Sequence, residues 1–504
     1  MLARRSEGML AGVLASALAL AALWLVSRLD AAVPFAPLEL AERVVRVTPG
    51  ALATFTIEQL GKAALHLLAA GVTALLLAIG MLLARLSRGR IATVAVPGYA
   101  IVLALTSLSG PNRAGTAPVA VSVAVAAVAY GLALVASRAS VGAATPVGDA
   151  PALRITRRRA LLVTSGAVAS LVGAGVVVGP IIKRAGERAR RFALRAPDEP
   201  ARAPSRGLLP ALAGRPPEIT AVAEHYVVDI DLVDPSLSAA SWTLEVTGAV
   251  ERPLRLAVAG LQRDFPLVEQ VSVLTCISNE VGGPLVGNSR WTGVRLADLL
   301  RRAGPHSSAD QLAFRCADGY TSALSLDDGL DPSVLVAIAQ NGQPLTQAHG
   351  FPCRLRVPAL YGMKNPKWLR SIEVRRSHLT ADWVKRGWSD AAMVRTASRI
   401  DIAPDARIGQ PVWIAGVAWA GDRRISAVEL SFDEGATWRR ARVQTPLSPL
   451  AWTQWAIRYT PTGGGVLTVA CRAIDGDGRT QDARSRRPHP SGASGYHQVR
   501  LQVS

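Results

Sequence analysis

Long apolar runs dominate the first 182 residues of the chain, and shorter alternating runs replace them afterwards. Five stretches are apolar over about 20 residues, the length that a helix needs to cross the hydrocarbon core of a membrane. Runs such as Ala63–Ala84 and Val119–Ala136 lack charge and any polar stripe, unlike a surface helix of a soluble protein. The pattern predicts transmembrane helices at about residues 8–27, 62–84, 91–109, 117–137 and 160–182.

A segment rich in Arg, Ala and Pro follows at residues 183–216, and its prolines favour an extended tether over a helix. Short β-like runs then alternate with turns, and a helix is predicted at Leu296–Ala303. This mixture predicts an α+β domain over residues 217–398. Its expected strands are Tyr226–Ile230, Trp242–Val246, Val271–Thr275, Leu312–Cys316, Leu335–Ala339 and Cys353–Val357.

From about Ile400 the pattern changes to alternating strands separated by turns that contain Gly and Asp, such as Asp475–Gly478. Regularly spaced short strands of this kind are typical of a β-sandwich, and we expect one of immunoglobulin type over residues 399–504. The expected strands are Pro411–Ala418, Ala427–Phe432, Gln454–Tyr459 and Val466–Ala473.

Composition supports this division. The chain of 504 residues is 50% hydrophobic but only 5% aromatic, and its net charge of +19 is concentrated in the apolar half. Residues 1–192 hold 20 Lys/Arg against 7 Asp/Glu, whereas residues 193–504 hold 36 against 30. The basic charge therefore flanks membrane segments and does not mark a nucleic-acid-binding module, so no nucleic-acid partner is expected.

Arginines in the short loops predict which way the chain crosses the membrane. Arg4 and Arg5 precede the first span, Arg85–Arg90 follow the second, and Arg154–Arg159 precede the fifth. These ends belong in the cytoplasm, which places the C-terminal half outside the cell membrane and gives the multi-pass N-terminal half the role of an anchor. The run Arg157–Arg159 before an apolar stretch also resembles a twin-arginine export signal, while the basic cluster Lys183–Arg191 opposes this orientation.

The four cysteines, Cys276, Cys316, Cys353 and Cys471, show neither CxxC nor haem-attachment spacing. Cys353 and Cys471 fall within predicted strands and are interpreted as core residues. Cys276 ends a predicted strand and precedes the polar, glycine-rich Ile277–Gly283. It is either a buried inert thiol or a thiolate that holds a soft metal, since glycine backbone lets a bulky group approach.

Several blocks, in order along residues 216–504, resemble the sulfite oxidase family of molybdopterin proteins. The likeness rests on Pro217–Thr220 with His225–Val227, Leu274–Cys276 with Asn279, Arg290–Leu296, Asn341–Leu345, His349–Arg354, Tyr361–Leu369, Gly416–Gly421 and Ser431–Trp438. The resemblance implies a sulfite-oxidase-type molybdopterin-binding domain followed by an immunoglobulin-like, dimerisation-type domain.

The resemblance also implies roles for single residues. Cys276 would be the protein ligand of molybdenum, beside the two sulfurs of a single pterin. His349 and Arg354 would meet the pterin phosphate, and Lys364 would add a second cation to which the Gly362 and Met363 backbone contributes. The remaining candidates are His225, Tyr226 and Cys316 for cofactor binding, and Tyr320 as a catalytic residue with Cys276.

The implied activity is two-electron oxygen-atom or electron transfer on a small molecule, with a separate cytochrome or membrane carrier as electron partner. The family's animal and plant sulfite oxidases follow the ligand cysteine with an Ala-Gly-Asn-Arg-Arg run, whereas Ile277–Glu280 places an acid here, which argues against sulfite. Two alternatives stay open: a reductase of sulfoxides or oxyanions, and a cofactor-free membrane-tethered binding scaffold.

Overall fold

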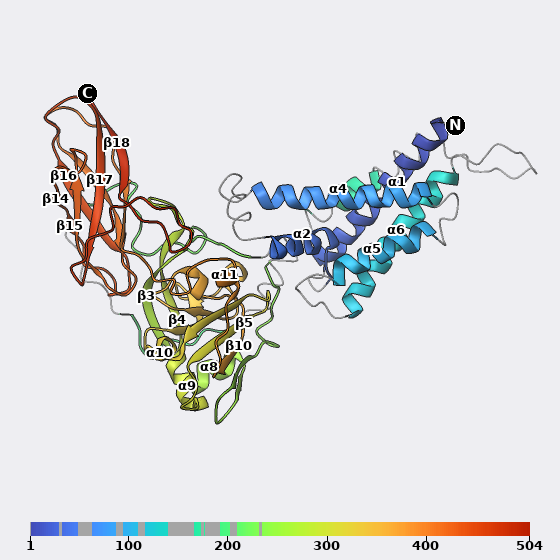
Figure 1. The fold of residues 1–504 in the computed structure, drawn as a ribbon, viewed down its shortest axis with the longest axis horizontal. Coiled ribbons are helices and arrows are strands. Elements are labelled where there is room, and N and C mark those ends of the chain that lie inside the picture. The colour runs from blue at the N-terminus through green and yellow to red at the C-terminus, as the bar shows by residue number, and fades with distance from the viewer. Residues whose placement is uncertain are drawn as a thin grey trace, which may run out of the picture. The chain divides into compact units, whose positions relative to one another are not determined.

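The computed structural model describes residues 2–29, 33–48, 63–86, 94–108, 116–139, 166–172, 176, 192–201, 209–230 and 234–504. The chain forms two compact units. One comprises Met1–Arg190 with Ile230–Ser236, and the other comprises Arg191–Asp229 with Leu237–Ser504. The first unit is helical and the second is built mainly of strands (Figure 1).

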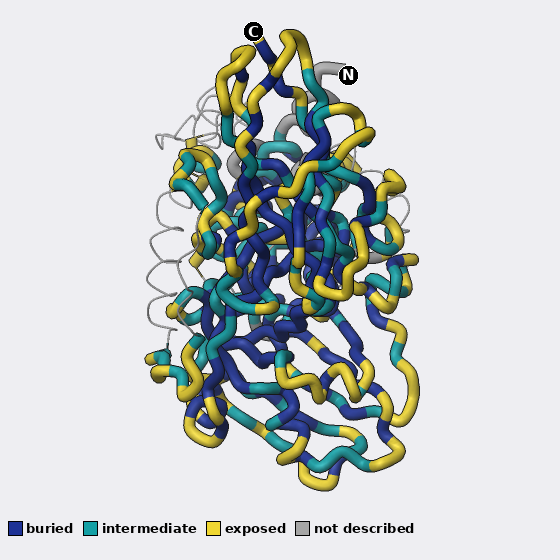
Figure 2. The backbone as a smooth tube through the Cα atoms, turned by 90° about the vertical axis from the view of Figure 1, so that its left-hand side faces the viewer, coloured by how far each residue is buried: buried dark blue, intermediate teal, exposed yellow. Residues whose placement is uncertain are grey.

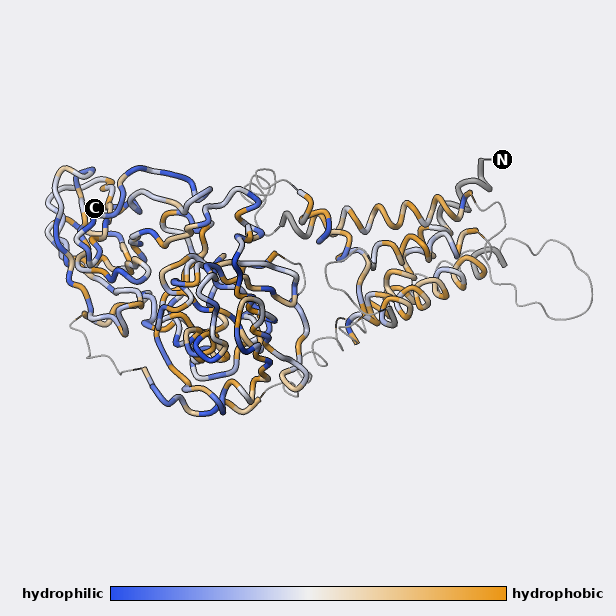
Figure 3. Tube along the Cα trace, turned by 60° about the horizontal axis from the view of Figure 1, so that its bottom comes forward, coloured by the Kyte–Doolittle hydropathy of each residue, from blue (hydrophilic) through white to orange (hydrophobic). Residues whose placement is uncertain are grey.

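Three helices of the first unit are long and apolar enough to cross a membrane. They are α1 (Leu2–Leu29), α4 (Ala63–Leu86) and α6 (Thr116–Ala139). Hydrophobic residues run along most of their length (Figure 3). At 1.5 Å of rise per residue, each exceeds the ~30 Å of a hydrocarbon core.

The prediction of five spans is corrected to three in the part of the chain that the structure describes. The stretch at 91–109 forms α5 (Val96–Leu108), and its 13 residues are too few to cross a membrane. Pro97 lies in the first turn, where proline sets a helix start. Of the stretch predicted at 160–182, the structure describes only residues 166–172 and 176, so this span is not tested. The expected loop between the first two spans contains a further helix, α2 (Ala36–Val47).

Small residues allow close packing inside this unit. A Cβ placed on Gly80 would lie 1.9 Å from the Ser16 Oγ, so a side chain at residue 80 would not fit between α4 and α1. The carbonyl of Gly80 accepts a hydrogen bond of 2.5 Å from the Tyr130 hydroxyl, and the ring of Tyr130 stacks on Tyr99 at 4.5 Å. Close approach through glycine is the usual packing device of membrane helices.

The second unit contains the predicted α+β domain, which has two sheets. One sheet has the order β3-β4-β7-β8, with β9 also on β7. The other has the order β2-β1-β10-β5-β6, in which β1 runs parallel to β10. The strands are β1 (Leu244–Gly248), β2 (Leu254–Leu256), β3 (Val268–Thr275), β4 (Val286–Arg295), β5 (Gln311–Cys316), β6 (Thr321–Ser325), β7 (Leu335–Gln340), β8 (Gln343–Pro344), β9 (Arg354–Arg356) and β10 (Leu369–Arg375).

Short helices connect these strands. The predicted helix is confirmed as α9 (Leu296–Ala303), which buries its leucines and ends at Gly304, whose left-handed backbone donates to the Leu300 carbonyl. The others are α8 (Val258–Asp264), α10 (Leu326–Leu330), α11 (Asp382–Lys385) and the 3₁₀ turns η2 (Gln347–His349) and η3 (Gly362–Lys364).

The strand predicted at Tyr226–Ile230 does not form. The backbone turns at Ala221, whose carbonyl accepts from the amides of Glu224 and His225, and continues without strand structure. Val227 and Val228 are 39% and 44% exposed, so no sheet face covers them. Cys353 lies immediately before β9 and is fully buried, as expected of a core residue.

The predicted tether is partly fixed to this domain. Residues 192–201 form no helix, and the Arg195 amide donates to the Gln262 Oε1 at 2.8 Å. The amides of Asp198 and Glu199 both donate to the Leu267 carbonyl. Residues 192–201 of the predicted tether are therefore part of the surface of this domain.

The C-terminal residues form two four-stranded antiparallel sheets over one core. The sheets are β11-β12-β16-β15 and β14-β13-β17-β18, and both contribute to a cluster that includes Trp455, Val428 and Leu501. Figure 2 shows buried strands with exposed turns between them. This is a β-sandwich, and its immunoglobulin type stays a prediction. The strands are β11 (Ala397–Ile402), β12 (Val412–Trp419), β13 (Ile425–Ser431), β14 (Arg439–Arg440), β15 (Arg442–Val443), β16 (Thr453–Tyr459), β17 (Gly465–Asp475) and β18 (His497–Val503).

Candidate functional site

Cys276 directly follows β3, at the start of a tight loop. Its amide donates to the Leu285 carbonyl at 3.0 Å, and its carbonyl accepts from the Asn279 amide at 3.1 Å. The Asn279 Oδ1 accepts from the Leu285 amide, which closes the loop at its base. The thiol is buried, 3.0 Å from the Ser278 Oγ, and burial raises the pKa of Cys276. Metal binding would have to displace its proton, as thiolate ligation always does.

The C-terminal sandwich holds the far end of this loop. The Arg399 Nη1 donates to the Gly283 carbonyl at 3.0 Å. Gly282 has φ +77, and a Cβ there would lie 2.1 Å from the His497 ring. Because only glycine suits that backbone and that contact, the loop and the sandwich fit together through residue 282.

Three tyrosines lie close enough to Cys276 for its charge to affect them. Tyr320 and Tyr361 are buried and Tyr226 is partly buried; the loss of hydration raises the pKa of each, and Cys276 is among the groups that raise it further. A Cβ on Gly362 would lie 3.0 Å from the Tyr226 hydroxyl and 3.7 Å from the Cys276 Cα, so Gly362 also belongs to this group. The phenols stay protonated at neutral pH and can act only as neutral hydrogen-bonding groups.

Tyr320 is oriented by η3. Its hydroxyl donates to the Met363 carbonyl at 2.6 Å, and the Ser322 Oγ donates to the same oxygen. The Cys316 amide bonds to the Tyr320 carbonyl, which places the predicted Cys316 beside Tyr320 on the turn between β5 and β6. Burial raises the pKa of Cys316, so its thiol is protonated.

Two buried arginines lie on β9. Arg354 and Arg356 are two residues apart and therefore face the same side of the strand. Their guanidinium groups lie 5.3 and 5.9 Å from the centre of the Trp291 ring. Arg354 donates to the carbonyls of His349 and Asn365.

Arg356 donates to the Asn365 Oδ1 at 2.8 Å and to the Val273 carbonyl. None of these bonds reaches a carboxylate, and the Nε of both arginines has no partner among the residues that the structure describes. Burial lowers the pKa of Arg354 to about 10 and that of Arg356 to about 9. The two guanidinium groups are thus buried away from water, and the Nε–H of each is left to donate to another group.

The two predicted histidines join this cluster. The rings of His225 and His349 meet edge to face at 5.6 Å, and His225 stacks on Tyr226 at 5.2 Å. The His349 Nε2 lies 3.0 Å from the Val222 carbonyl and must carry the proton, because a carbonyl only accepts. The His225 Nε2 is buried and has no hydrogen-bond partner in the described part of the chain. Burial lowers the pKa of His225 to about 3 and that of His349 to about 4, so both rings are neutral at pH 7.

Lys364 is placed differently from the others. Its Nζ donates to the Asp390 Oδ1 at 2.6 Å and to the Ala323 carbonyl at 2.9 Å. The Lys364 ammonium group, which was predicted to bind a pterin phosphate, is therefore paired with a carboxylate of this chain. A contact between Lys364 and a cofactor stays a prediction.

The residues present fit a molybdenum-pterin group. A buried thiol suits a soft metal, and unpaired guanidinium and imidazole nitrogens suit a phosphate. A buried cation without an anion is costly, so the arginine pair on β9 favours an anionic ligand. Sequence reasoning missed Arg356 and Asn365. The alternation Arg354-Leu355-Arg356 could have revealed Arg356, because side chains two residues apart on a strand lie on the same face.

Comparison with known proteins agrees with this geometry. Residues 231–383 match the oxidoreductase molybdopterin binding domain, and residues 389–503 match the Mo-co oxidoreductase dimerisation domain. Human mitochondrial sulfite oxidase is 30% identical over 340 residues, which cover 55% of this chain and 62% of that protein. A barley NADH nitrate reductase is 29% identical over 328 residues, covering 52% of this chain and 36% of that protein.

Among solved structures, the sulfane dehydrogenase SoxCD from Paracoccus pantotrophus matches with a TM-score of 0.49 and 23% identity, covering 54% of this chain and 78% of that chain. The chain spans less than two thirds of the length of the two enzymes above. The two matched domains adjoin in sequence, in the order that the sequence predicted. The chain belongs to the sulfite oxidase family of molybdopterin-dependent oxidoreductases.

Proposed function

We propose that this protein is a membrane-anchored oxidoreductase in which Cys276 ligates the molybdenum of a single pterin cofactor on the extracytoplasmic side. The observation that carries the proposal is the pairing of a buried thiol at the end of β3 with the unpartnered Nε atoms of Arg354 and Arg356. When bound, the cofactor supplies two-electron oxygen-atom or electron transfer to a small-molecule substrate.

The chain's own residues hold and orient this group. Cys276 binds the metal as a thiolate, and the loop that Asn279 closes fixes the direction of its sulfur. Arg354 and His349 bind the anionic end of the cofactor, and Arg356 adds a second cation. His225, Cys316 and the Gly362–Lys364 turn complete the cofactor site. Tyr226 and Tyr320 stay protonated, as neutral phenols near the thiol. We propose Tyr320 as the catalytic one.

A cofactor-free scaffold is a poorer account of the same residues. Such a protein would gain from replacing two buried arginines with apolar side chains, because isolated buried charge destabilises a fold. The sulfoxide or oxyanion reductase alternative uses the same site in the opposite direction. Electrons would pass to or from a separate cytochrome or membrane carrier, and the C-terminal domain would form a homodimer.

Metal analysis tests the proposal. The protein purified from a host that makes the cofactor should contain about one molybdenum per chain and release a phosphorylated pterin on denaturation. Protein from the same host grown without molybdate is the control and should fold without the metal. A folded, membrane-extracted wild type that lacks molybdenum in both cultures would favour the scaffold instead.

Membrane anchoring is supported by the outward faces of the helices. Leu75 and Leu82 on α4 and Val128 and Leu132 on α6 are all about half exposed or more. Helices that are apolar on every side suit lipid. The orientation rests on the arginine-rich loops.

A reporter fused after Ser504 should therefore be inactive if it works only in the cytoplasm, and active if it works only outside. A matched fusion after Arg88, in the loop predicted to be cytoplasmic, should show the opposite pattern. Cytoplasmic activity at Ser504 would reverse the topology and make Lys183–Arg191 the inside signal.

A further inference from the structure

The segment that contains α11 and the residues after it is bound to a tyrosine of the candidate site. The Tyr361 amide donates to the Ala392 carbonyl at 2.8 Å, and the Tyr361 hydroxyl accepts from the Arg395 amide at 3.2 Å. A Cβ on Gly362, the next residue, would lie 3.7 Å from the Cys276 Cα. Backbone contacts therefore connect this segment to the loop that carries the thiol.

A loop of the sandwich, residues 482–491, packs on the same segment. The Ser389 amide donates to the Pro490 carbonyl at 3.0 Å. The ring of His489 meets the ring of Trp388 edge to face at 5.0 Å. The two segments, far apart in the sequence, thus form one continuous surface.

Aromatic side chains connect this surface to the interior. One apolar cluster contains both Trp388 and Ile277, the residue that follows the candidate ligand, and Trp383 packs against it while partly exposed. The Arg386 guanidinium lies 5.0 Å from the centre of the Trp383 ring. Met393 is 57% exposed. Aromatic residues, Met and Arg are the side chains enriched in protein interfaces.

The rim of this surface is basic. Residues 382–395 and 482–490, which we call the basic face, hold six Lys/Arg against three Asp, an excess that is half of the excess over residues 193–504. Asp382 and Asp482 lie 4.0 and 3.9 Å from two of the cations, and surface pairs of this kind are weak. The exposed cations are Lys385, Arg484, Arg486 and Arg487.

We propose that the basic face docks an acidic redox protein that exchanges electrons with the Cys276 site. The proposal rests on the proposed function and names the surface on which its electron partner binds and the charge of that partner. Opposite charge steers association, and electron-transfer complexes bury small areas, so charge contributes much of their recognition. The site in its two-electron-reduced form gives one electron to each of two partner molecules, and no atom is transferred.

Two cytochromes of opposite charge test this. Molybdenum-loaded full-length protein in detergent is reduced with dithionite, freed of the excess and mixed with an oxidised c-type cytochrome that is either acidic or basic. Absorbance follows cytochrome reduction, and calorimetry measures binding separately. The acidic cytochrome should react at least about tenfold faster than the basic one at low salt, and this advantage should fall as salt screens the charges.

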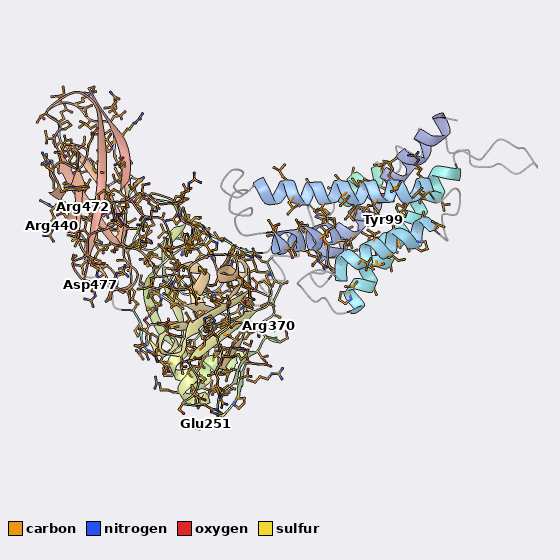
Figure 4. The ribbon with its side chains drawn as sticks, in the orientation of Figure 1. Tyr99, Glu251, Arg370, Arg440, Arg472 and Asp477 are labelled. Carbon is orange, nitrogen blue, oxygen red and sulfur yellow. The ribbon has the colours of Figure 1, made fainter. Side chains whose placement is uncertain are left out.

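The double variant Lys385→Glu/Arg484→Glu removes the positive excess of the basic face. Its reaction with the acidic cytochrome should be at least about tenfold slower than that of the wild type, and its binding correspondingly weaker. Arg252→Glu/Arg255→Glu is the matched control, because it makes the same change of charge at exposed positions beside Glu251, near α9 (Figure 4). The control should behave as the wild type.

Equal rates and equal binding in the two double variants would overturn the proposal, as would faster reaction of the wild type with the basic cytochrome. Vesicles of phosphatidylglycerol and of phosphatidylcholine test a membrane as the occupant. If Lys385→Glu/Arg484→Glu loses only its binding to phosphatidylglycerol, the basic face contacts lipid and the proposal is wrong. Failure of the proposed function would appear separately, as wild-type protein without molybdenum.

Discussion

Cys276→Ser should abolish redox activity while the protein still folds and inserts into the membrane. A serine hydroxyl is a poor ligand for a soft metal, so the protein bond to molybdenum is lost. We expect turnover per chain to fall at least about 100-fold, because changes even to the groups that merely orient a metal ligand cost 10- to 100-fold. The checks are turnover and the Mo(V) signal in electron paramagnetic resonance.

Cys471→Ser is the matched control for this prediction. Cys471 is a fully buried free cysteine on β17, and its Sγ contacts the Ser398 Oγ at 3.2 Å much as Cys276 contacts Ser278. The same atom change there should cost stability of about 1 kcal/mol and leave turnover unchanged. An unaltered Mo(V) signal and unaltered turnover in Cys276→Ser would show that another residue ligates the metal.

The sequence predicted those parts of the fold whose signals are local. Leu296–Ala303 has helical apolar spacing and a glycine just beyond its end, and α9 occupies that range. The strand before Cys276 is a run of apolar and β-branched residues, and β3 contains it. In the sandwich, alternation placed the strands to within a few residues, as with β12 and β16.

The failures occurred where distant partners decide the structure. Tyr226–Ile230 has the composition of a strand, but the chain turns at Ala221 and no neighbouring strand pairs with it. For Lys364, whose contact with a cofactor stays a prediction, no local pattern signals that Asp390, 26 residues later, lies beside its ammonium group. In the membrane half, apolar composition identified 91–109 but could not show that the helix there has only 13 residues.

Some residues of the candidate site were likewise found from the sequence, and others only from the fold. Cys276, His349 and Arg354 came from short motifs, and the structure brings His225, His349 and Arg354 together around Trp291. Asn365 had no motif of its own. Its Oδ1 accepts from Arg356 and from the Val357 amide, while its Nδ2 donates to the carbonyls of Leu360 and Tyr361. Only the folded turn shows that one amide side chain connects β9 to the segment before η3.

Arg354→Met should lower the molybdenum content of the protein much more than the turnover of the molecules that are still loaded. Methionine fills the space against Trp291 but cannot bind a phosphate. Charge-assisted hydrogen bonds of the kind lost contribute about 1.5–3 kcal/mol, which is about 10- to 100-fold in cofactor affinity. The measurements are molybdenum per chain and activity per molybdenum, with the exposed Arg370→Met (Figure 4) as the control that removes an arginine of the same domain.

In protein without the cofactor, Arg354→Met should not weaken the fold and should instead leave its stability unchanged or raise it. Because burial lowers the pKa of Arg354 to about 10, below its ordinary 12.5, the charged side chain opposes folding until an anion joins it. Arg354→Met should therefore unfold at the same or a higher denaturant concentration than the wild type when both lack cofactor, and at a lower one when both are supplied with it. A residue that contacts the substrate would instead leave molybdenum content normal while activity per molybdenum collapses. That result would move Arg354 from the phosphate of the cofactor to the substrate.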